Sequence, residues 1–263
     1  MGFLTDVVAQ VRRDLERSPL DERALLARAL ATPPPRDFTA AVRSGRGRPA
    51  IVAEIKRASP SAGAIADADP GTLARAYQDA DAAAVSVLTE PRHFAGSVVD
   101  LREARLACGL PILRKDFLVH PAQVIESRAA GADAVLLIAA CLSAPELEAL
   151  LGTAADLGLG ALVETHSDGD LERALAADAP IVGVNARDLE TLEIDEERAL
   201  ALARRVPAGR TLVFESGISR REQVERAVEA GASAVLVGEA LMRAPDPAAK
   251  VRELLGAAVV VEP

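Results

Sequence analysis

The chain has very few aromatic side chains: of its 263 residues none is Trp, one is Tyr and five are Phe. The apolar half of the sequence is therefore mostly Ala, Val and Leu, a composition expected where helices pack on buried parallel strands. Cysteine is equally scarce. Cys108 and Cys141 match no metal or redox spacing, which indicates reduced, packed thiols.

Positive charge and long apolar runs are also limited. The 30 Lys and Arg residues are outnumbered by 39 Asp and Glu, and the formal charge of −9 disfavours nucleic acid and anionic membranes as partners. The longest apolar run, residues 134–142, is too short to cross a bilayer. The N-terminal residues contain neither a signal-peptide core nor a myristoylation motif. We therefore expect a cytoplasmic protein.

An internal repeat of about 25 residues organises the chain after residue 50. Residues 80–85 (ADAAAV), 130–135 (AGADAV) and 230–235 (AGASAV) repeat one pattern of helix end, turn and strand start. Short aliphatic runs with the same period predict eight strands, at residues 51–55, 84–88, 111–114, 134–138, 161–164, 181–184, 211–215 and 234–237. Helical patterns separate these runs.

Eight such units favour an α/β fold of the (βα)8 TIM barrel type. A doubly wound open sheet would need a glycine-rich turn after the first strand, where this chain has RASPS. The first fifty residues contain two helical patterns, around residues 5–17 and 21–30, and no strand. We expect residues 1–50 to form a helical N-terminal extension packed on a barrel of residues 51–263, with one domain overall.

Ionisable side chains stand at the carboxyl ends of the predicted strands, where barrels of this type carry their active sites. Because side chains alternate along a strand, Glu54 and Lys56 point the same way at the end of the first strand. Taken alone, this pair is as compatible with a structural ion pair as with a catalytic one. The later strand ends add Lys115, Glu164, Asn185, Arg187, Glu215 and Ser216. So many polar groups on one rim predict a site.

Two glycine-containing turns predict a phosphate cup after the last two strands. Ser216 and Gly217 follow the seventh strand, and Gly238 and Glu239 follow the eighth, so both segments expose backbone N–H groups before a helix. Tight turns without a ligand are the alternative. We expect the backbone N–H of Glu239, and not its carboxylate, to face the anion.

Phe94 and Phe117 follow the second and third strands, on the predicted catalytic face, where they could line an aromatic substrate; core packing is the alternative. The three histidines, His93, His120 and His166, lack metal-ligand spacing, and no metal site is predicted. His166 lies two residues after Glu164, and we expect it at the surface.

Several motifs together resemble the indole-3-glycerol phosphate synthase family. The segments are IVAEIKRASPSAG, SVLTEPRHF, LRKDF, GADAVLLIAA, ALVETHSD, IVGVNARDLETLEID, VFESGIS and AVLVGEALM, and they occur in the family's order over nearly the whole chain. The resemblance implies a barrel enzyme of tryptophan biosynthesis. Its substrate would be 1-(2-carboxyphenylamino)-1-deoxyribulose 5-phosphate, which is closed, decarboxylated and dehydrated without a metal or cofactor.

The resemblance also implies residue roles. Lys115 would be the general acid for ring closure, with a pKa lowered by burial or by Lys56, and Glu164 would transfer a proton during dehydration. Lys56 would bridge anionic parts of the substrate while Glu54 orients it. The remaining matches would hold the carboxylate, hydroxyls or phosphate: Asn185, Arg187, Glu215, Ser216, Ser59, Gly217, Gly238 and Glu239.

Two other functions stay open at this point. A phosphoribosylanthranilate isomerase would carry a Cys at the end of its first strand, where this chain has Lys56. A non-catalytic barrel subunit would have lost a charge from the rim, and none is lost. Three departures from the family pattern are Ala62 in place of Lys, Ala186 in place of a polar residue, and VETHSD in place of VEVHD. We expect a monomer or weak homo-oligomer.

Overall fold

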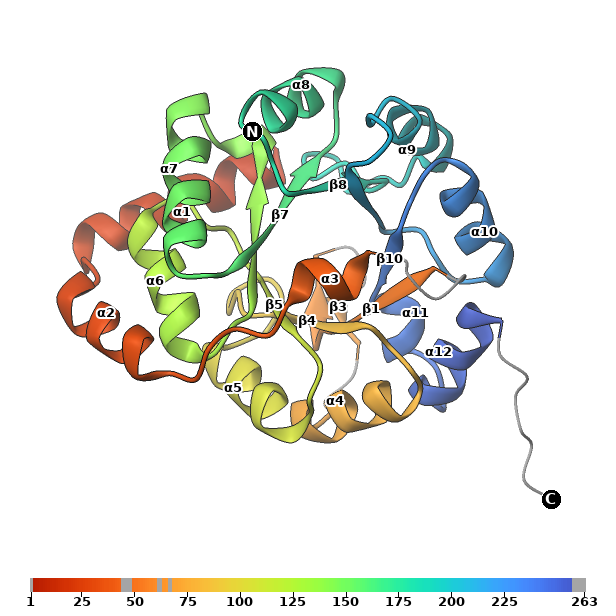
Figure 1. The fold of residues 1–263 in the computed structure, drawn as a ribbon, viewed down its shortest axis with the longest axis horizontal. Helices are drawn as coiled ribbons and strands as arrows, with labels where there is room; N and C mark the ends of the chain where they lie inside the picture. Colours follow the sequence, from red (N-terminus) through yellow and green to blue (C-terminus); the bar gives the residue numbers. More distant parts are fainter. Residues whose placement is uncertain (1, 44–48, 61–62, 66–67, 257–263) are drawn as a thin grey trace.

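In the computed structural model, which describes residues 2–43, 49–60, 63–65 and 68–256, eight parallel strands close into a barrel (Figure 1). The predicted TIM barrel is confirmed, and each predicted strand agrees with the structure to within one residue at either end. Around the barrel the strands follow the order β1-β10-β9-β8-β7-β6-β5-β4. Their bounds are β1 Ala50–Ile55, β4 Ala84–Leu88, β5 Ile112–Lys115, β6 Ala134–Ile138, β7 Gly160–Thr165, β8 Ile181–Asn185, β9 Thr211–Glu215 and β10 Ala234–Val237.

Helices form a ring outside the strands (Figure 1). The ends of these helices are fixed by the local sequence. For example, Ser97 accepts a hydrogen bond from the Asp100 N–H at the start of α5, and Gly131 takes the left-handed conformation that ends α6. The ring consists of α4 Pro70–Asp79, α5 Val98–Ala107, α6 Pro121–Ala130, α7 Ala144–Asp156, α8 Asp168–Ala176, α9 Glu196–Ala203, α10 Arg221–Glu229, α11 Glu239–Met242 and α12 Pro247–Leu255, with the short 3-10 helix η1 Ala139–Cys141 after β6.

Three helices precede the barrel: α1 Phe3–Arg17, α2 Glu22–Ala31 and α3 Phe38–Val42. The sequence did not predict α3. It lies across the end of the barrel where the strands begin (Figure 1), and its Phe38 side chain packs against Gly160, the first residue of β7. The amino-terminal end of the barrel is thereby closed, which leaves the carboxyl-terminal end as the mouth.

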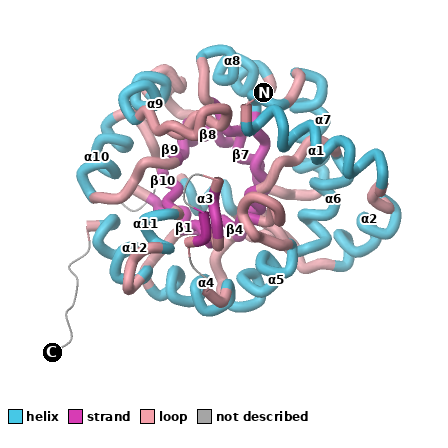
Figure 2. The backbone as a smooth tube through the Cα atoms, turned by 180° about the vertical axis from the view of Figure 1, so that it is seen from behind, coloured by secondary structure: helices cyan, strands magenta, loops and turns pink. Residues whose placement is uncertain are grey.

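The N-terminal extension is also tied to the mouth. The backbone N–H groups of Phe3 and Leu4 donate to the carbonyls of Glu190 and Leu189 in the loop after β8. Figure 2 shows the barrel from the side opposite to Figure 1, with α1 running beside α7 and α6. On that path Arg12 forms an ion pair of 2.8 Å with a glutamate of α7. The extension therefore reaches both ends of the barrel.

A two-stranded hairpin that the sequence did not predict follows β1. Its strands, β2 Ala58–Ser59 and β3 Gly63–Ala64, pair antiparallel. Ser61 and Ala62, the second of which is a departure from the family pattern, lie outside the described residues. None of the helices in the described ranges is long and apolar enough to cross a membrane.

Candidate active site

A cavity of about 420 Å³ opens at the carboxyl ends of the strands. Its wall contains every residue that the sequence predicted for the site: Glu54, Lys56, Ser59, Phe94, Lys115, Phe117, Glu164, Asn185, Arg187, Glu215, Ser216, Gly217, Gly238 and Glu239. The wall also contains polar and aromatic residues that sequence reasoning missed, among them Phe3, Asp116 and Arg243.

Lys115 is the centre of the ion pairs in this cavity. Its Nζ lies 3.0 Å from Glu164 Oε2 and 2.8 Å from Glu215 Oε2. Both carboxylates are almost completely buried. Together with Glu54 these residues come from β5, β7, β9 and β1, which are alternate strands of the barrel. Alternate strands supply the side chains of one layer in a TIM barrel, so the fold itself gathers these four groups.

A glycine on β8 and a glycine directly after β10 make room for two of the carboxylates. A Cβ atom at Gly183 of β8 would lie 2.4 Å from Glu215 Oε1, and one at Gly238 would lie 2.2 Å from Glu54 Oε1. Carbon and oxygen do not approach that closely without displacement. Gly238 therefore has a role that the predicted phosphate cup did not include, because it allows the Glu54 carboxylate to lie against the end of β10.

The pKa of Lys115 is raised, so the prediction of a lowered value was wrong. Burial alone would favour the neutral amine, but the carboxylates of Glu164, Glu215 and Glu54 outweigh it and raise the pKa. Lys56, which we expected to lower this pKa, is itself paired with a carboxylate, because its Nζ lies 3.0 Å from Glu54 Oε1. The free site thus holds Lys115 as an ammonium group, the form that can donate a proton.

The two carboxylates on Lys115 have opposite pKa shifts. Burial would raise the pKa of Glu164, but Lys115 and His166 outweigh it and hold that pKa well below its usual range. Burial, opposed by Lys115 and reinforced by the Glu164 carboxylate, raises the pKa of Glu215 to about 7. Glu164 is therefore ionised at neutral pH, whereas Glu215 holds a proton up to about pH 7, a separation typical of acid and base pairs.

His166 is not at the surface, and that prediction was wrong. Its side chain is 10% exposed, and its Nε2 lies 3.2 Å from Glu164 Oε1. The turn after β7 holds it inward, because its backbone N–H donates to Asp170 and its carbonyl accepts from Arg198. Burial would lower the pKa of this imidazole, but the Glu164 carboxylate outweighs it and raises the pKa. The sequence contained one indication that His166 lies in the site: it follows Glu164 by two residues, so both side chains are expected on the same side of the strand end.

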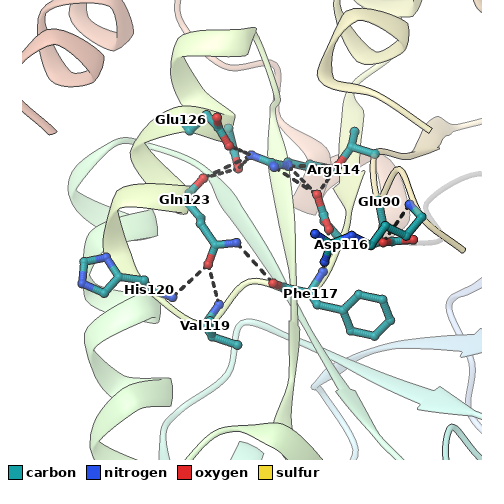
Figure 3. A network of polar contacts seen from close by, with 11 residues as sticks. Glu90, Arg114, Asp116, Phe117, Val119, His120, Gln123 and Glu126 are labelled. Carbon is teal, nitrogen blue, oxygen red and sulfur yellow. Dashed lines mark hydrogen bonds and ion pairs between the residues drawn. The ribbon is translucent and has the colours of Figure 1, made fainter. Parts of the chain in front are cut away.

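Buried polar contacts on both sides of Lys115 fix the segment that carries it (Figure 3). Arg114 donates to Asp116 Oδ2 at 3.0 Å and to Glu126 Oε2 at 2.8 Å. Asp116 Oδ1 accepts from the Phe117 N–H, and Gln123 donates to the Phe117 carbonyl. The charged residues around Lys115 were visible in the RKDF motif, but their role as its support follows only from the contacts.

Three phenylalanine rings form an aromatic wall in the cavity. The ring of Phe117 lies 6.4 Å from that of Phe94 and 6.3 Å from that of Phe3. Phe3 comes from α1, so the extension contributes directly to the site. Sequence reasoning missed Phe3 because it precedes the barrel by some fifty residues, although the scarcity of Phe was a usable signal.

The turn after β9 and the start of α11 form the opposite end of the cavity. Ser216 and Gly217 have consecutive positive φ angles of 66° and 75°, a conformation that turns successive backbone N–H groups to one side. The Glu239 carboxylate lies between two guanidinium groups, with Oε1 3.1 Å from Arg243 Nε and Oε2 3.7 Å from Arg187 Nη2. These cations lie beside the predicted phosphate cup.

The departures from the family pattern leave the ionisable groups in place. Ala186 is completely buried, and its carbonyl accepts a hydrogen bond from the backbone N–H of Asp195. Thr165, from the VETHSD segment, is buried and donates its hydroxyl to the Gly183 carbonyl of the neighbouring strand. Within the described ranges, no group of three or more His, Cys, Asp or Glu residues could hold a metal ion.

Comparison with known proteins gives one consistent result. The family model described as "Indole-3-glycerol phosphate synthase" matches residues 4–254. Indole-3-glycerol phosphate synthase of Micrococcus luteus is 47% identical over 99% of this chain and 100% of its own length. The protein of the same name from a Nocardioides species is 50% identical over 97% of this chain and 99% of its own length.

Solved structures with lower identity share the fold. A 3-hexulose-6-phosphate synthase superposes with a TM-score of 0.64 at 18% identity, covering 80% of this chain and 100% of the other. The tryptophan synthase alpha-subunit of Pyrococcus furiosus, as a mutant, gives a TM-score of 0.60 at 18% identity, covering 80% of this chain and 98% of the other. At this identity the likeness establishes the barrel alone.

Proposed function

The chain belongs to the indole-3-glycerol phosphate synthase family, and we propose that its cavity converts 1-(2-carboxyphenylamino)-1-deoxyribulose 5-phosphate to indole-3-glycerol phosphate, CO2 and water. The observation that carries this proposal is the bridge that Lys115 makes between Glu164 and Glu215, a buried acid and base cluster between an aromatic wall and a turn suited to phosphate. The setting we propose is tryptophan biosynthesis in the cytoplasm.

The two ends of the cavity match the two ends of the substrate. The phosphate binds the backbone N–H groups around Ser216–Gly217 and Gly238–Glu239, and Arg187 and Arg243 lie nearby. Ser59 contributes to the same phosphate site. The carboxyphenyl ring packs on the Phe94 and Phe117 rings. Lys56 neutralises anionic charge on the substrate as it binds, which supports binding by a protein of net negative charge.

Ring closure needs a proton donor at the ketone oxygen. The ring carbon that bears the carboxylate attacks the ketone carbon, the carbonyl π electrons move to oxygen, and that oxygen takes a proton from the Lys115 ammonium group. The pKa of Lys115 is raised in the free site by its carboxylate neighbours. Substrate entering between Lys115 and these carboxylates weakens their hold and makes the ammonium group a stronger acid.

Decarboxylation and dehydration complete the reaction. The bond to the carboxyl carbon breaks, CO2 leaves, and its electron pair restores the aromatic ring. The new hydroxyl then departs as water with a proton from Glu215, and Glu164 removes the proton from the carbon next to the nitrogen. The assignment follows the pKa values, because Glu164 is ionised while burial raises the pKa of Glu215 to about 7. Asn185 and Glu54 hold the reacting hydroxyl and carbonyl in place.

Product analysis tests this proposal. The purified protein, given the carboxyphenylamino sugar phosphate, should release one CO2 for each indole-3-glycerol phosphate formed, as measured by trapped CO2 and by mass spectrometry. An isomerase of the preceding step would act on the phosphoribosyl anthranilate and release no CO2. A non-catalytic barrel would bind the substrate, measured by calorimetry, and leave it unchanged. Either of these results would replace the proposal.

A further inference from the structure

The imidazole of His166 lies behind Glu164 and has no part in the reaction steps above. Its Nε2 lies 3.2 Å from Glu164 Oε1, while Lys115 Nζ lies 3.0 Å from the other oxygen, Oε2. Glu164 is thus placed between two basic groups, one on each oxygen. His166 does not line the cavity, so any influence it has on the substrate passes through Glu164.

The surroundings of His166 come from four elements. Glu164 of β7 contacts the ring, and Glu215 of β9 is near enough for its charge to favour the protonated imidazole. Asp170 of α8 accepts from the His166 backbone N–H, and Arg198 of α9 donates to its carbonyl. Asp188, in the loop after β8, is close enough for its carboxylate to be influenced by the imidazole. Acidic groups therefore outnumber the one guanidinium group around the ring, which favours a protonated imidazole.

The hydrogen-bonding needs of the two side chains match. Both ring nitrogens of His166 and the Oε1 atom of Glu164 are buried, and none of them has an aligned hydrogen-bond partner among the described residues. A buried polar atom without a partner is costly. A small rotation of the imidazole at the observed distance of 3.2 Å satisfies Nε2 and Oε1 together.

The net charge of the cluster depends on the protonation of its members. With Lys115 as an ammonium group and both Glu164 and Glu215 ionised, the three groups carry one excess negative charge. A single proton, held by His166 or by Glu215, makes the cluster neutral.

We propose that His166 is a positioning residue that holds Oε1 of Glu164, so that Oε2 stays turned towards Lys115 and the substrate. This inference rests on the proposed function, in which Glu164 removes a proton during dehydration. Without the imidazole, Glu164 would be free to rotate and its two oxygens would no longer differ. The expected loss is in the rate of the chemical steps and not in substrate binding, because His166 does not touch the cavity.

The contact itself can be tested without turnover. The chain has three histidines, so ¹⁵N-labelled imidazoles give few NMR signals, and H166Q assigns the one from His166. We expect its titration midpoint above the ordinary value of about 6.5 in the free enzyme. In E164Q the midpoint should fall below that in the wild type. An equal midpoint in both proteins would overturn the proposal.

Kinetics test the positioning role. H166L should lower kcat about tenfold with KM nearly unchanged, and H166Q, whose amide can still donate to Glu164, should recover most of the loss. H120N is the matched control, because His120 is exposed and Asn preserves the cap it provides for α6. Equal kcat values for H166L and H120N would contradict the proposal. If the wild-type protein releases no CO2, the proposed function is wrong, and the NMR midpoints alone decide whether His166 holds Glu164.

Discussion

The carboxylate of Glu215 lies directly against Gly183 on the neighbouring strand. The space that a Cβ atom would need at residue 183 is filled by Glu215 Oε1, 2.4 Å from the ideal Cβ position. The close approach lets the Glu215 side chain reach across β8 to Lys115, to which it binds at 2.8 Å. A backbone position with no side-chain chemistry of its own thus determines where Glu215 lies in the ion-pair cluster around Lys115.

The substitution G183A should therefore remove most of the activity. The added methyl group displaces the Glu215 carboxylate from Lys115, and a misplacement of about 1 Å in an active site costs about a hundredfold in rate. Steady-state kinetics measure kcat. G152A is the control, since a Cβ at Gly152 in α7 meets no atom within 4 Å. It should keep full activity and gain about 1 kcal/mol in stability, as expected for Gly to Ala within a helix. Full activity in G183A would show that the position of Glu215 is not critical.

Glu215 should make the folded protein less stable as the pH rises. Its pKa is about 7 in the folded state, against an ordinary value of about 4.3 in the unfolded chain. Between these values the folded state binds more protons, so the free energy of unfolding falls with increasing pH. E215Q has no such proton to lose, and its stability relative to wild type should increase between pH 5 and pH 8.

Urea unfolding at several pH values measures this difference. The exposed residue Glu148 supplies the control variant E148Q, which should follow the wild type at every pH. A constant difference between E215Q and wild type would mean that Glu215 binds no extra proton in the folded state.

The support of Lys115 predicts a large loss of stability in R114M. The Arg114 side chain is 5% exposed, and its removal leaves Asp116 and Glu126 without their shared cation. Breaking a buried ion pair by removing one partner costs about 3 kcal/mol or more. Urea unfolding measures the change, with R102M, at an exposed position of α5, as the control expected to stay within about 0.5 kcal/mol of wild type. If R114M and R102M had similar free energies of unfolding, the proposed role of Arg114 in supporting Lys115 would be refuted.

The contribution of the N-terminal extension to the cavity predicts weaker substrate binding in F3A. Phe3 packs edge-on against Phe117, with ring centres 6.3 Å apart. We expect the Phe3 ring to make a similar aromatic contact with the substrate ring, worth about 1 kcal/mol, and its loss corresponds to about a fivefold rise in KM with little change in kcat. L30A, an exposed position on α2, is the control from the same extension. An unchanged KM in F3A would place the ring outside the substrate site.

The architecture was predictable because the repeat and the strand pattern are local properties of the sequence. Glu54, Lys115, Glu164 and Glu215 are far apart in the sequence. In a closed barrel of eight parallel strands, however, the strand ends that carry them all lie on the same rim. The turns at Gly217 and Gly238 could also be predicted, because they follow directly after strands in the sequence.

What the sequence could not supply are contacts between distant segments. The position of Phe3 depends on how α1 crosses the barrel, and α3 is a five-residue helix stabilised by the barrel end it covers. His166 looks like a polar loop residue until the turn after β7 is seen to hold it against Glu164. The pKa of Lys115 depends on three carboxylates from three other strands, which reverses the sign expected from burial.

The most direct test of the whole account is the turnover of K115M compared with K250M. The chain has only three lysines, and Lys250 lies on α12, away from the cavity, so the two variants remove the same side chain from different places. The account predicts that K115M releases no CO2 from the carboxyphenylamino sugar phosphate while still binding it, and that K250M matches the wild type. Substantial CO2 release by K115M would contradict the assignment of Lys115 as the general acid.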